Sequence, residues 1–266
     1  MKTLILLFSL LLIPLMTINA QAGIAVTPGR VFYTVAPGGE NIQTIKVNNP
    51  TQGELEVGVS FADWDYETNG NNNIVEAGTL ENSCSDWIQV FPDTYFILSA
   101  GESKDVQVMM KVPSELDHTI PVHTSMLFFT QLNPGQSQNK EGAAIQVTVR
   151  MGVKIYHSAV SEPIHEIDIV DFKKNEDGAE KKQVALHLKN IGESWTNGAV
   201  VWEIMNKSTG KTIKMPKSEF YTLPADLRVV TQQLPQDLSP GNYTLSATVT
   251  YGDNDVINIA EMDFSI

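Results

Sequence analysis

Between Ala143 and Ile155, apolar residues occupy every second position of the chain. Side chains of a β-strand point alternately to its two faces, so this pattern predicts one long strand over residues 145–156 with Ile145, Val147 and Val149 on the same face. The seven alternating positions exceed the roughly five or six residues of an ordinary strand. Part of this apolar row therefore exceeds what one small core needs and could be donated to a partner.

The rest of the chain alternates short apolar segments with turn signals such as Pro37–Gly39 and Asn133–Gly135. No segment has a sustained helical period, so we expect very little helix. Strands are predicted in the first half at residues 29–35, 43–48, 54–63, 86–90, 95–98, 104–112, 123–132 and 145–156. In the second half they are predicted at residues 166–172, 182–190, 198–206, 212–215, 228–234, 241–251 and 256–266. The fold class predicted is all-β, with two immunoglobulin-like β-sandwich domains in tandem.

The short polar segment Ser158–Pro163, which ends in proline, is typical of a domain linker. It divides the chain into a first domain at residues 23–157 and a second domain at residues 164–266. The second domain contains the sequence Leu238–Tyr243, which is typical of a tyrosine corner. In that motif the phenol hydroxyl bonds back to the backbone just before a core strand, which supports a second sandwich.

Residues 1–22 have the features of a secretory signal peptide. Lys2 precedes an apolar run from Leu4 to Leu15, and the small residues Ala20 and Ala22 follow with the spacing of a cleavage site. The apolar run is too short to span a membrane comfortably, and no cysteine stands at the cleavage point to accept a lipid. We therefore expect a soluble exported protein.

Charge and cysteine content exclude several classes of protein. The chain has 18 basic and 31 acidic residues, a net charge of −13, so nucleic acid is not an expected partner. Cys84 is the one cysteine, so an internal disulfide is impossible and stability must come from packing. We expect Cys84 to be a small buried residue rather than a reactive thiol.

The sequence contains no catalytic, nucleotide-binding or zinc-binding motif, so we predict no enzymatic activity, no cofactor and no metal. The acidic segments Asp63–Asp65 and Asp253–Asp255 could touch calcium, but ordinary acidic turns are the simpler interpretation. We expect Trp195 and Trp202 to lie in the second core; an exposed pair that stacks on a sugar is the alternative.

Four short segments follow one another along the first half of the chain: Gly29–Tyr33, Phe91–Leu98, Thr124–Phe129 and Val153–Tyr156. In this order they resemble the periplasmic pilus-assembly chaperones of the chaperone/usher pathway. The resemblance covers residues 24 to 157, and it extends to the second domain only in architecture. Members of this family have two immunoglobulin-like domains and bind pilin-like subunits that lack their last strand.

The resemblance implies that the alternating strand is a donor strand, which replaces the strand that the subunit lacks. In this family that strand completes the subunit by β-augmentation. The positions that match the donated residues are Ile145, Val147 and Val149, with Ala143 as a weaker fourth. From the pattern alone, a strand that covers only this protein's own core is the simpler interpretation.

The family also binds the C-terminal carboxylate of the subunit between two cations, and the matching positions here are Arg30 and Lys154. A guanidinium can bind a carboxylate through two parallel hydrogen bonds, and an ammonium adds a compact charge. Such an anchor would set the register of the donor strand, because a slip of one residue turns its apolar side chains away. Without the resemblance, two solvated strand ends would be the simpler interpretation.

Two functions follow as expectations. The first is a periplasmic chaperone for pilin-like secreted subunits, acting without nucleotide, with an outer-membrane usher as an implied second partner. A free molecule of this kind could also cover its own donor strand by self-association. The second is an exported cell-envelope adhesion or scaffold protein whose two sandwiches bind a surface protein or glycan permanently.

Overall fold

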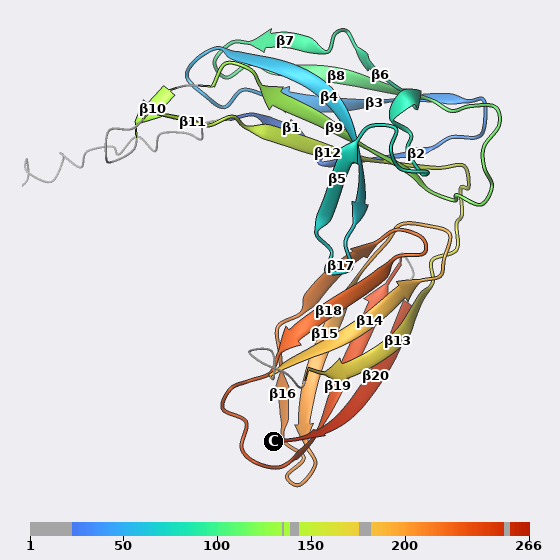
Figure 1. Ribbon diagram of the computed structural model, residues 1–266, viewed down its shortest axis with the longest axis vertical. Helices are drawn as coiled ribbons and strands as arrows, with labels where there is room; N and C mark the ends of the chain where they lie inside the picture. Colours follow the sequence, from blue (N-terminus) through green and yellow to red (C-terminus); the bar gives the residue numbers. More distant parts are fainter. Residues whose placement is uncertain (1–22, 135, 139–143, 176–181, 253–255) are drawn as a thin grey trace, which may run out of the picture.

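The computed structural model describes residues 23–134, 136–138, 144–175, 182–252 and 256–266. The predicted signal peptide, Ala143 and Asp253–Asp255 lie outside these residues. Figure 1 shows two β-sandwiches that meet at an angle, the first built from β1 to β12 and the second from β13 to β20. The prediction of an all-β chain with two tandem immunoglobulin-like domains is confirmed. Within the described residues the only helix is a single 3₁₀ turn at Ser85–Trp87, and no helix has the length and hydropathy needed to cross a bilayer.

The first sandwich consists of a four-stranded and a six-stranded sheet. The four-stranded sheet has the order β1 (Ala25–Thr27), β3 (Glu40–Asn48), β8 (Ser103–Lys111) and β6 (Ile88–Phe91). The six-stranded sheet has the order β2 (Arg30–Thr34), β12 (Arg150–Ser158), β9 (His123–Gln131), β4 (Leu55–Tyr66) and β5 (Asn72–Glu76), and β7 (Tyr95–Leu98) pairs with β4. A separate hairpin joins β10 (Gln136–Gln138) to β11 (Ala144–Gln146).

The core of the first sandwich lies between the inner faces of these two sheets. From β12, Val153 and Ile155 are fully buried there beside Leu127 and Phe129 of β9. Cys84 is also fully buried, as the sequence predicts, and its burial raises the pKa of the thiol. The free thiol therefore acts as a small core residue.

The second sandwich has a three-stranded sheet of β13 (Ile167–Lys174), β14 (Gln183–Asn190) and β18 (Leu227–Gln233). Its five-stranded sheet has the order β16 (Thr212–Lys214), β15 (Thr196–Asn206), β19 (Asn242–Tyr251) and β20 (Val256–Ser265), and β17 (Ser218–Thr222) pairs with β15. Trp202 is fully buried in its core. The Tyr243 hydroxyl donates to the carbonyl of Ser239 at 2.7 Å, so the predicted tyrosine corner is confirmed.

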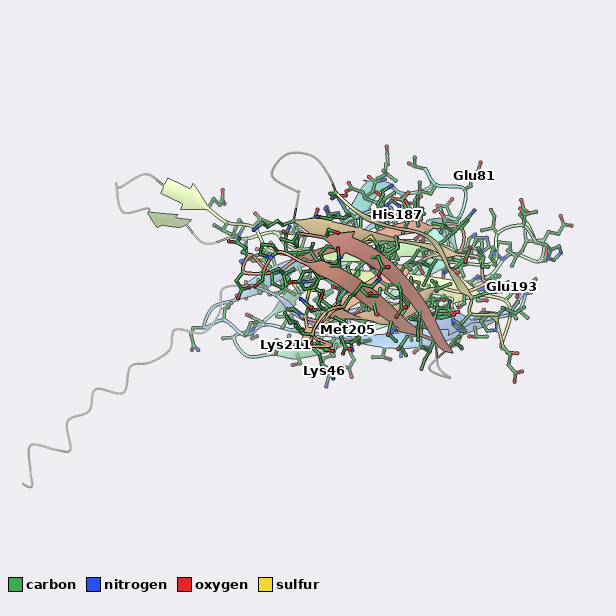
Figure 2. All side chains as sticks on the ribbon, turned by 90° about the horizontal axis from the view of Figure 1, so that it is seen from below. Lys46, Glu81, His187, Glu193, Met205 and Lys211 are labelled. Atoms are coloured by element: carbon green, nitrogen blue, oxygen red, sulfur yellow. The ribbon has the colours of Figure 1, made fainter. Side chains whose placement is uncertain are left out.

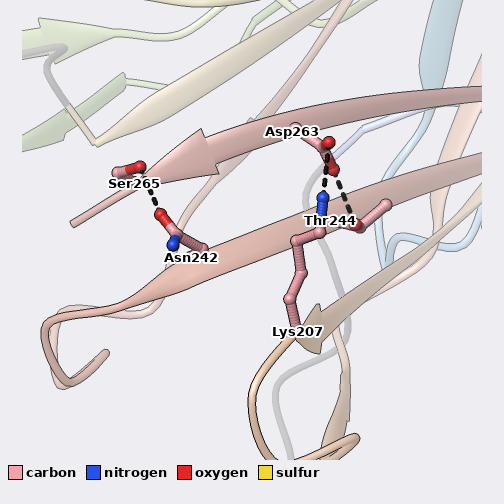
Figure 3. Close-up of polar contacts among 5 residues, drawn as sticks. All are labelled: Lys207, Asn242, Thr244, Asp263 and Ser265. Carbon is pink, nitrogen blue, oxygen red and sulfur yellow. Dashed lines mark hydrogen bonds and ion pairs between the residues drawn. The ribbon is translucent and has the colours of Figure 1, made fainter.

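The outer surface of the second sandwich carries ordinary paired polar side chains (Figure 3). The Lys207 ammonium lies 2.7 Å from one oxygen of Asp263, and the Thr244 hydroxyl donates to the other at the same distance. Next to them, Ser265 donates to Asn242 at 2.8 Å. The charges of Lys207 and Asp263 therefore neutralise each other on this surface.

The structure corrects one prediction about the alternating segment, because it is not one continuous strand. Residues 147–149 lie between β11 and β12, outside any strand. β11 pairs with β10 in the separate hairpin, whereas β12 pairs with β2 and β9 in the main sheet. The alternation is thus shared between two different pairing partners, which the pattern of side chains does not reveal.

Candidate carboxylate-binding site between the two domains

The candidate site lies on the outer face of the six-stranded sheet, where the first domain meets the second. Strand register places Lys154 of β12 beside Arg30 of β2 and beside Met126 of β9. The backbone N–H of Lys154 also donates to the Gly29 carbonyl at 3.1 Å. The parallel pairing of β2 with β12 thus brings together two cations that are 124 positions apart in the sequence, as the resemblance predicts.

Lys154 is held among polar oxygens and aromatic rings. Its ammonium donates to the Tyr66 hydroxyl at 2.9 Å and to Oδ1 of Asn72 at 2.6 Å. It also lies 3.8 Å from the ring centroid of Trp64 and 4.1 Å from that of Tyr66. Burial, together with the nearby Arg30 guanidinium, lowers the pKa of Lys154 to about 7. The surroundings therefore disfavour the charged form of Lys154, and an anion that binds beside the ammonium would stabilise that form.

Arg30 reaches from the first domain to the second. Its guanidinium lies 4.4 Å from the ring centroid of Tyr221, which belongs to β17. The ion pairs within the described part of the chain involve Lys173 with Asp171 and Lys207 with Asp263. Neither Arg30 nor Lys154 has a carboxylate partner among those residues, so two neighbouring cations face the junction without a counter-charge.

The two domains contact each other through aromatic rings beside this site. The ring of Trp195 lies 5.0 Å from Phe32 and 5.3 Å from Tyr156, both of the first domain. Trp195 is only partly buried and joins the interdomain cluster instead of the second core, so that part of the prediction is wrong. Trp202 does lie in the second core as expected. The correction has a physical basis, because Trp195 precedes β15 at the end of the sandwich that faces the first domain.

A second interdomain contact comes from the hairpin of β4 and β5, which extends from the first domain toward the second (Figure 1). The carbonyl of Thr68 at its tip accepts from the backbone N–H of Val229 at 2.7 Å and from the Arg228 guanidinium at 2.9 Å. Gly70 adopts a φ of +86°, a conformation that a residue with a Cβ would adopt only with strain, and a Cβ there would also meet the Arg228 guanidinium. The same hairpin supplies Asn72 to the site, so interdomain docking and the position of Lys154 depend on one element.

A hollow of about 800 Å³ opens beside the two cations. Arg30 and Lys154 stand at its edge with Tyr66, Asn72 and Tyr221, and it continues over an apolar floor. The residues that form the floor and its walls are Phe32, Ile74, Met126, Phe128 and Gly152. The site can thus accept an anion and an apolar group side by side.

The three predicted donor positions lie just before β12. Val147 is 61% exposed, Val149 is partly buried against Gly23, and the backbone of Ile145 belongs to β11. Further along the same alternation, Val153 and Ile155 are fully buried in the protein's own core. The row therefore covers this core at one end and leaves at least Val147 uncovered at the other.

The acidic segment Asp63–Asp65 does not form a turn, which corrects the simpler of the two interpretations above. Asp63 lies within β4 and is fully buried. Its carboxylate accepts from the backbone N–H groups of Thr79 and Leu80 and from two serine hydroxyls, Ser83 and Ser85. Its role is to hold the segment after β5. No group of three or more metal-ligating side chains occurs in the described ranges.

Sequence reasoning missed three side chains of the site, namely Tyr66, Asn72 and Tyr221. The asparagine-rich segment 69–73 has the composition of a turn, and only its pairing with β4 shows that Asn72 begins a strand. Tyr221 is on β17, a short strand that the sequence pattern did not predict. The unusual length of the connection between β4 and β6 was the one feature of the sequence that could have indicated an additional strand at Asn72.

No family model matches the chain, and no curated protein matches it in sequence. Similar solved structures include the class 5 fimbrial chaperone CfaA, at 12% identity and a TM-score of 0.48 over 91% of this chain and 98% of that chain. The E. coli chaperone DraB has 15% identity and a TM-score of 0.46 over 92% and 97%. A structure of the Salmonella enterica SafA pilin in complex with the SafB chaperone has 14% identity and a TM-score of 0.46 over 92% and 97%.

Fimbrial chaperones thus stand among the similar structures, and identities of this size concern the fold alone.

Proposed function

We propose that this protein is a periplasmic chaperone of the pilus-assembly type, which binds pilin-like secreted subunits by donor-strand complementation. The observation that carries the proposal is the pairing of Arg30 with Lys154 in one strand register, without a carboxylate partner in the described residues. It is supported by the exposed donor position Val147, which precedes Lys154 on the same segment.

The two cations bind the C-terminal carboxylate of the subunit. The Arg30 guanidinium offers two parallel N–H donors, and the Lys154 ammonium adds a compact charge. An arriving carboxylate counteracts the burial and the like charge that lower the pKa of Lys154. Binding near neutral pH therefore takes up a proton on Lys154 and strengthens both contacts.

The anchored carboxylate sets the register of the subunit strand against the donor residues. Ile145, Val147 and Val149 then insert into the groove that the missing strand leaves in the subunit. Burial of each such side chain contributes about 1.5–3 kcal/mol, so three contribute roughly 5–9 kcal/mol before the cost of ordering. A complex of this strength protects an aggregation-prone subunit and still releases it.

Export and assembly complete the proposal. The signal peptide at residues 1–22 directs the chain to the periplasm, where subunits arrive unfolded. An outer-membrane usher receives the complex, and free molecules self-associate through the uncovered donor row. The protein acts by binding alone, without catalysis or a cofactor.

Co-expression with a candidate subunit, exported from the same cells, tests the proposal. We expect the wild-type protein to keep the subunit soluble, and the double variant R30E/K154E to lose this effect, because two negative charges repel the carboxylate. The matched control is K46E/K211E, which reverses two exposed lysines outside the site (Figure 2). Circular dichroism checks that both variants fold.

Rescue of the subunit by R30E/K154E at the wild-type level would contradict the anchor. Loss of rescue in K46E/K211E as well would show a dependence on overall charge and not on the site. A protein that stays bound to the subunit after its assembly into a fibre would favour the permanent scaffold over the chaperone.

A further inference from the structure

We propose that the hollow beside Arg30 and Lys154 receives the side chain of the subunit's last residue and selects a large apolar residue there. The inference rests on the proposed function, because it concerns the residue whose carboxylate the two cations bind. It adds a specificity for the chemistry of the C-terminal residue that the cations alone do not provide.

The floor of the hollow is formed by side chains that point outward from adjacent strands. Register places Phe128 of β9 beside Gly152 of β12, and Phe32 of β2 follows Arg30 by two positions on the same face. Ile74 of β5 closes the opposite side. Phe32 is 44% exposed and Ile74 is 47% exposed, so large apolar surface remains uncovered within reach of the cations.

Gly152 lets the side chains of Met126 and Phe128 lie close against β12, where they form part of the floor. A Cβ at this position would lie 2.9 Å from the sulfur of Met126 and 3.0 Å from a ring carbon of Phe128, so a larger residue would push these two side chains out of the floor. Gly152 precedes Lys154 by two positions on one strand face, a separation of about 7 Å. An aromatic or long aliphatic side chain spans such a distance, whereas glycine or alanine does not.

The charges around the hollow identify its occupant. The residues that line it include Arg30 and Lys154 but no Asp or Glu, and the Arg150 guanidinium covers the ring of Phe128 at 3.5 Å. An occupant must therefore combine an anion with an apolar group a short distance away, and a basic side chain is repelled. A C-terminal residue with a large apolar side chain has this combination.

Synthetic peptides test this specificity. We would titrate the full-length protein with acetylated ten-residue peptides of alternating threonine and valine that differ only at the last residue: phenylalanine, glycine, or phenylalanine with an amidated C-terminus. Isothermal titration calorimetry gives the dissociation constants. We expect the phenylalanine acid to bind about tenfold more tightly than the glycine acid, because a buried aromatic ring adds apolar contact.

Two serine variants test whether the preference for phenylalanine arises in the hollow. Ile74→Ser should reduce the preference for phenylalanine to about threefold or less, while Ile42→Ser should preserve it. Ile42 is the matched control, because it is 50% exposed and lies on β3 in the other sheet. Both positions are exposed, so both variants should fold.

The outcomes separate the two proposals. Equal affinity for the phenylalanine and glycine acids, with weaker binding of the amide, would overturn the specificity and leave the carboxylate anchor in place. Equal affinity for the acid and the amide would overturn the anchor itself. A preference that Ile42→Ser reduces as much as Ile74→Ser would also overturn the assignment of the hollow.

Discussion

The two ends of the segment from residue 145 to residue 157 differ in burial although the same alternation runs through both. Val153, Ile155 and His157 are fully buried, whereas Val147 is 61% exposed. The buried end is covered because β12 is paired with β2 and β9 and faces a second sheet. The other end lies beyond that sheet. An alternating pattern thus defines which side chains share a face, and the neighbouring strands decide whether that face is covered.

The largest effect that we expect is a difference in the free energy of unfolding between substitutions at the two ends of this segment. Ile155→Ala should lower the free energy of unfolding by about 2–5 kcal/mol, because it leaves a cavity in a fully buried site. Val147→Ala should change it by less than about 0.5 kcal/mol. Urea unfolding followed by tryptophan fluorescence measures both. Similar losses in the two variants would mean that the two ends are equally packed.

The buried end should also make stability depend on pH. His157 pairs with His123 across β12 and β9, their ring centroids lie 5.6 Å apart, and the Nδ1 atom of each is buried without a partner in the described residues. Burial, with a smaller effect of His157, lowers the pKa of His123 to about 4, and burial also lowers the pKa of His157. Because the unfolded chain binds protons first, this stability is present above pH 6.5 and is lost as the pH falls toward 4.

We expect this loss to be on the order of 2 kcal/mol. Urea midpoints at pH 7 and pH 4.5 measure it in the wild-type protein and in His123→Gln, which cannot gain a proton at this position. The variant should lose less stability than the wild type between these two pH values. An identical loss in both would show that other groups cause the acid sensitivity.

The smallest effects that we expect concern the stability contributions of two lysines, Lys154 in the candidate site and Lys207 on the outer surface of the second sandwich. Lys207→Met should lower the free energy of unfolding by at most about 1 kcal/mol, because the exposed pair with Asp263 is screened by water. Lys154→Met should cause no loss at pH 7, because its ammonium is disfavoured in its buried position while a methionine keeps the contact with Trp64.

The pH dependence of stability tests whether the charged form of Lys154 destabilises the folded protein. The pKa of Lys154 in the folded protein, about 7, lies below the usual lysine value, so the wild type should gain stability between pH 7 and pH 9, and Lys154→Met should not. Thermal unfolding at these two pH values distinguishes the proteins. A clear loss of stability in Lys154→Met would show that the lysine has a structural role in place of a binding role.

Much of the fold could be predicted from local pattern. The strands at 95–98 and 123–131 follow runs of apolar residues between turn signals, and the tyrosine corner at Tyr243 follows from a short local motif. Strand β5 could not be predicted in this way, because its segment begins with asparagines that usually form turns. Its pairing with β4 decides its structure.

The candidate site shows the same division. Arg30 and Lys154 were indicated by the order of short segments along the chain, and the parallel pairing of β2 with β12 places them side by side. Tyr221 and Trp195 come from the second domain, and their contacts with the first depend on how the two sandwiches dock. No periodicity in the sequence encodes such contacts.

The all-β class, the two sandwiches and the shared face of the alternating residues follow from the amino-acid sequence, because they depend on local turns and on a period of two. Packing decides where that face is covered, how the β4–β5 hairpin contacts Lys154 and which cations lack a carboxylate partner in the described residues. These properties depend on residues far apart in the chain, which come together only when the sheets and domains pack.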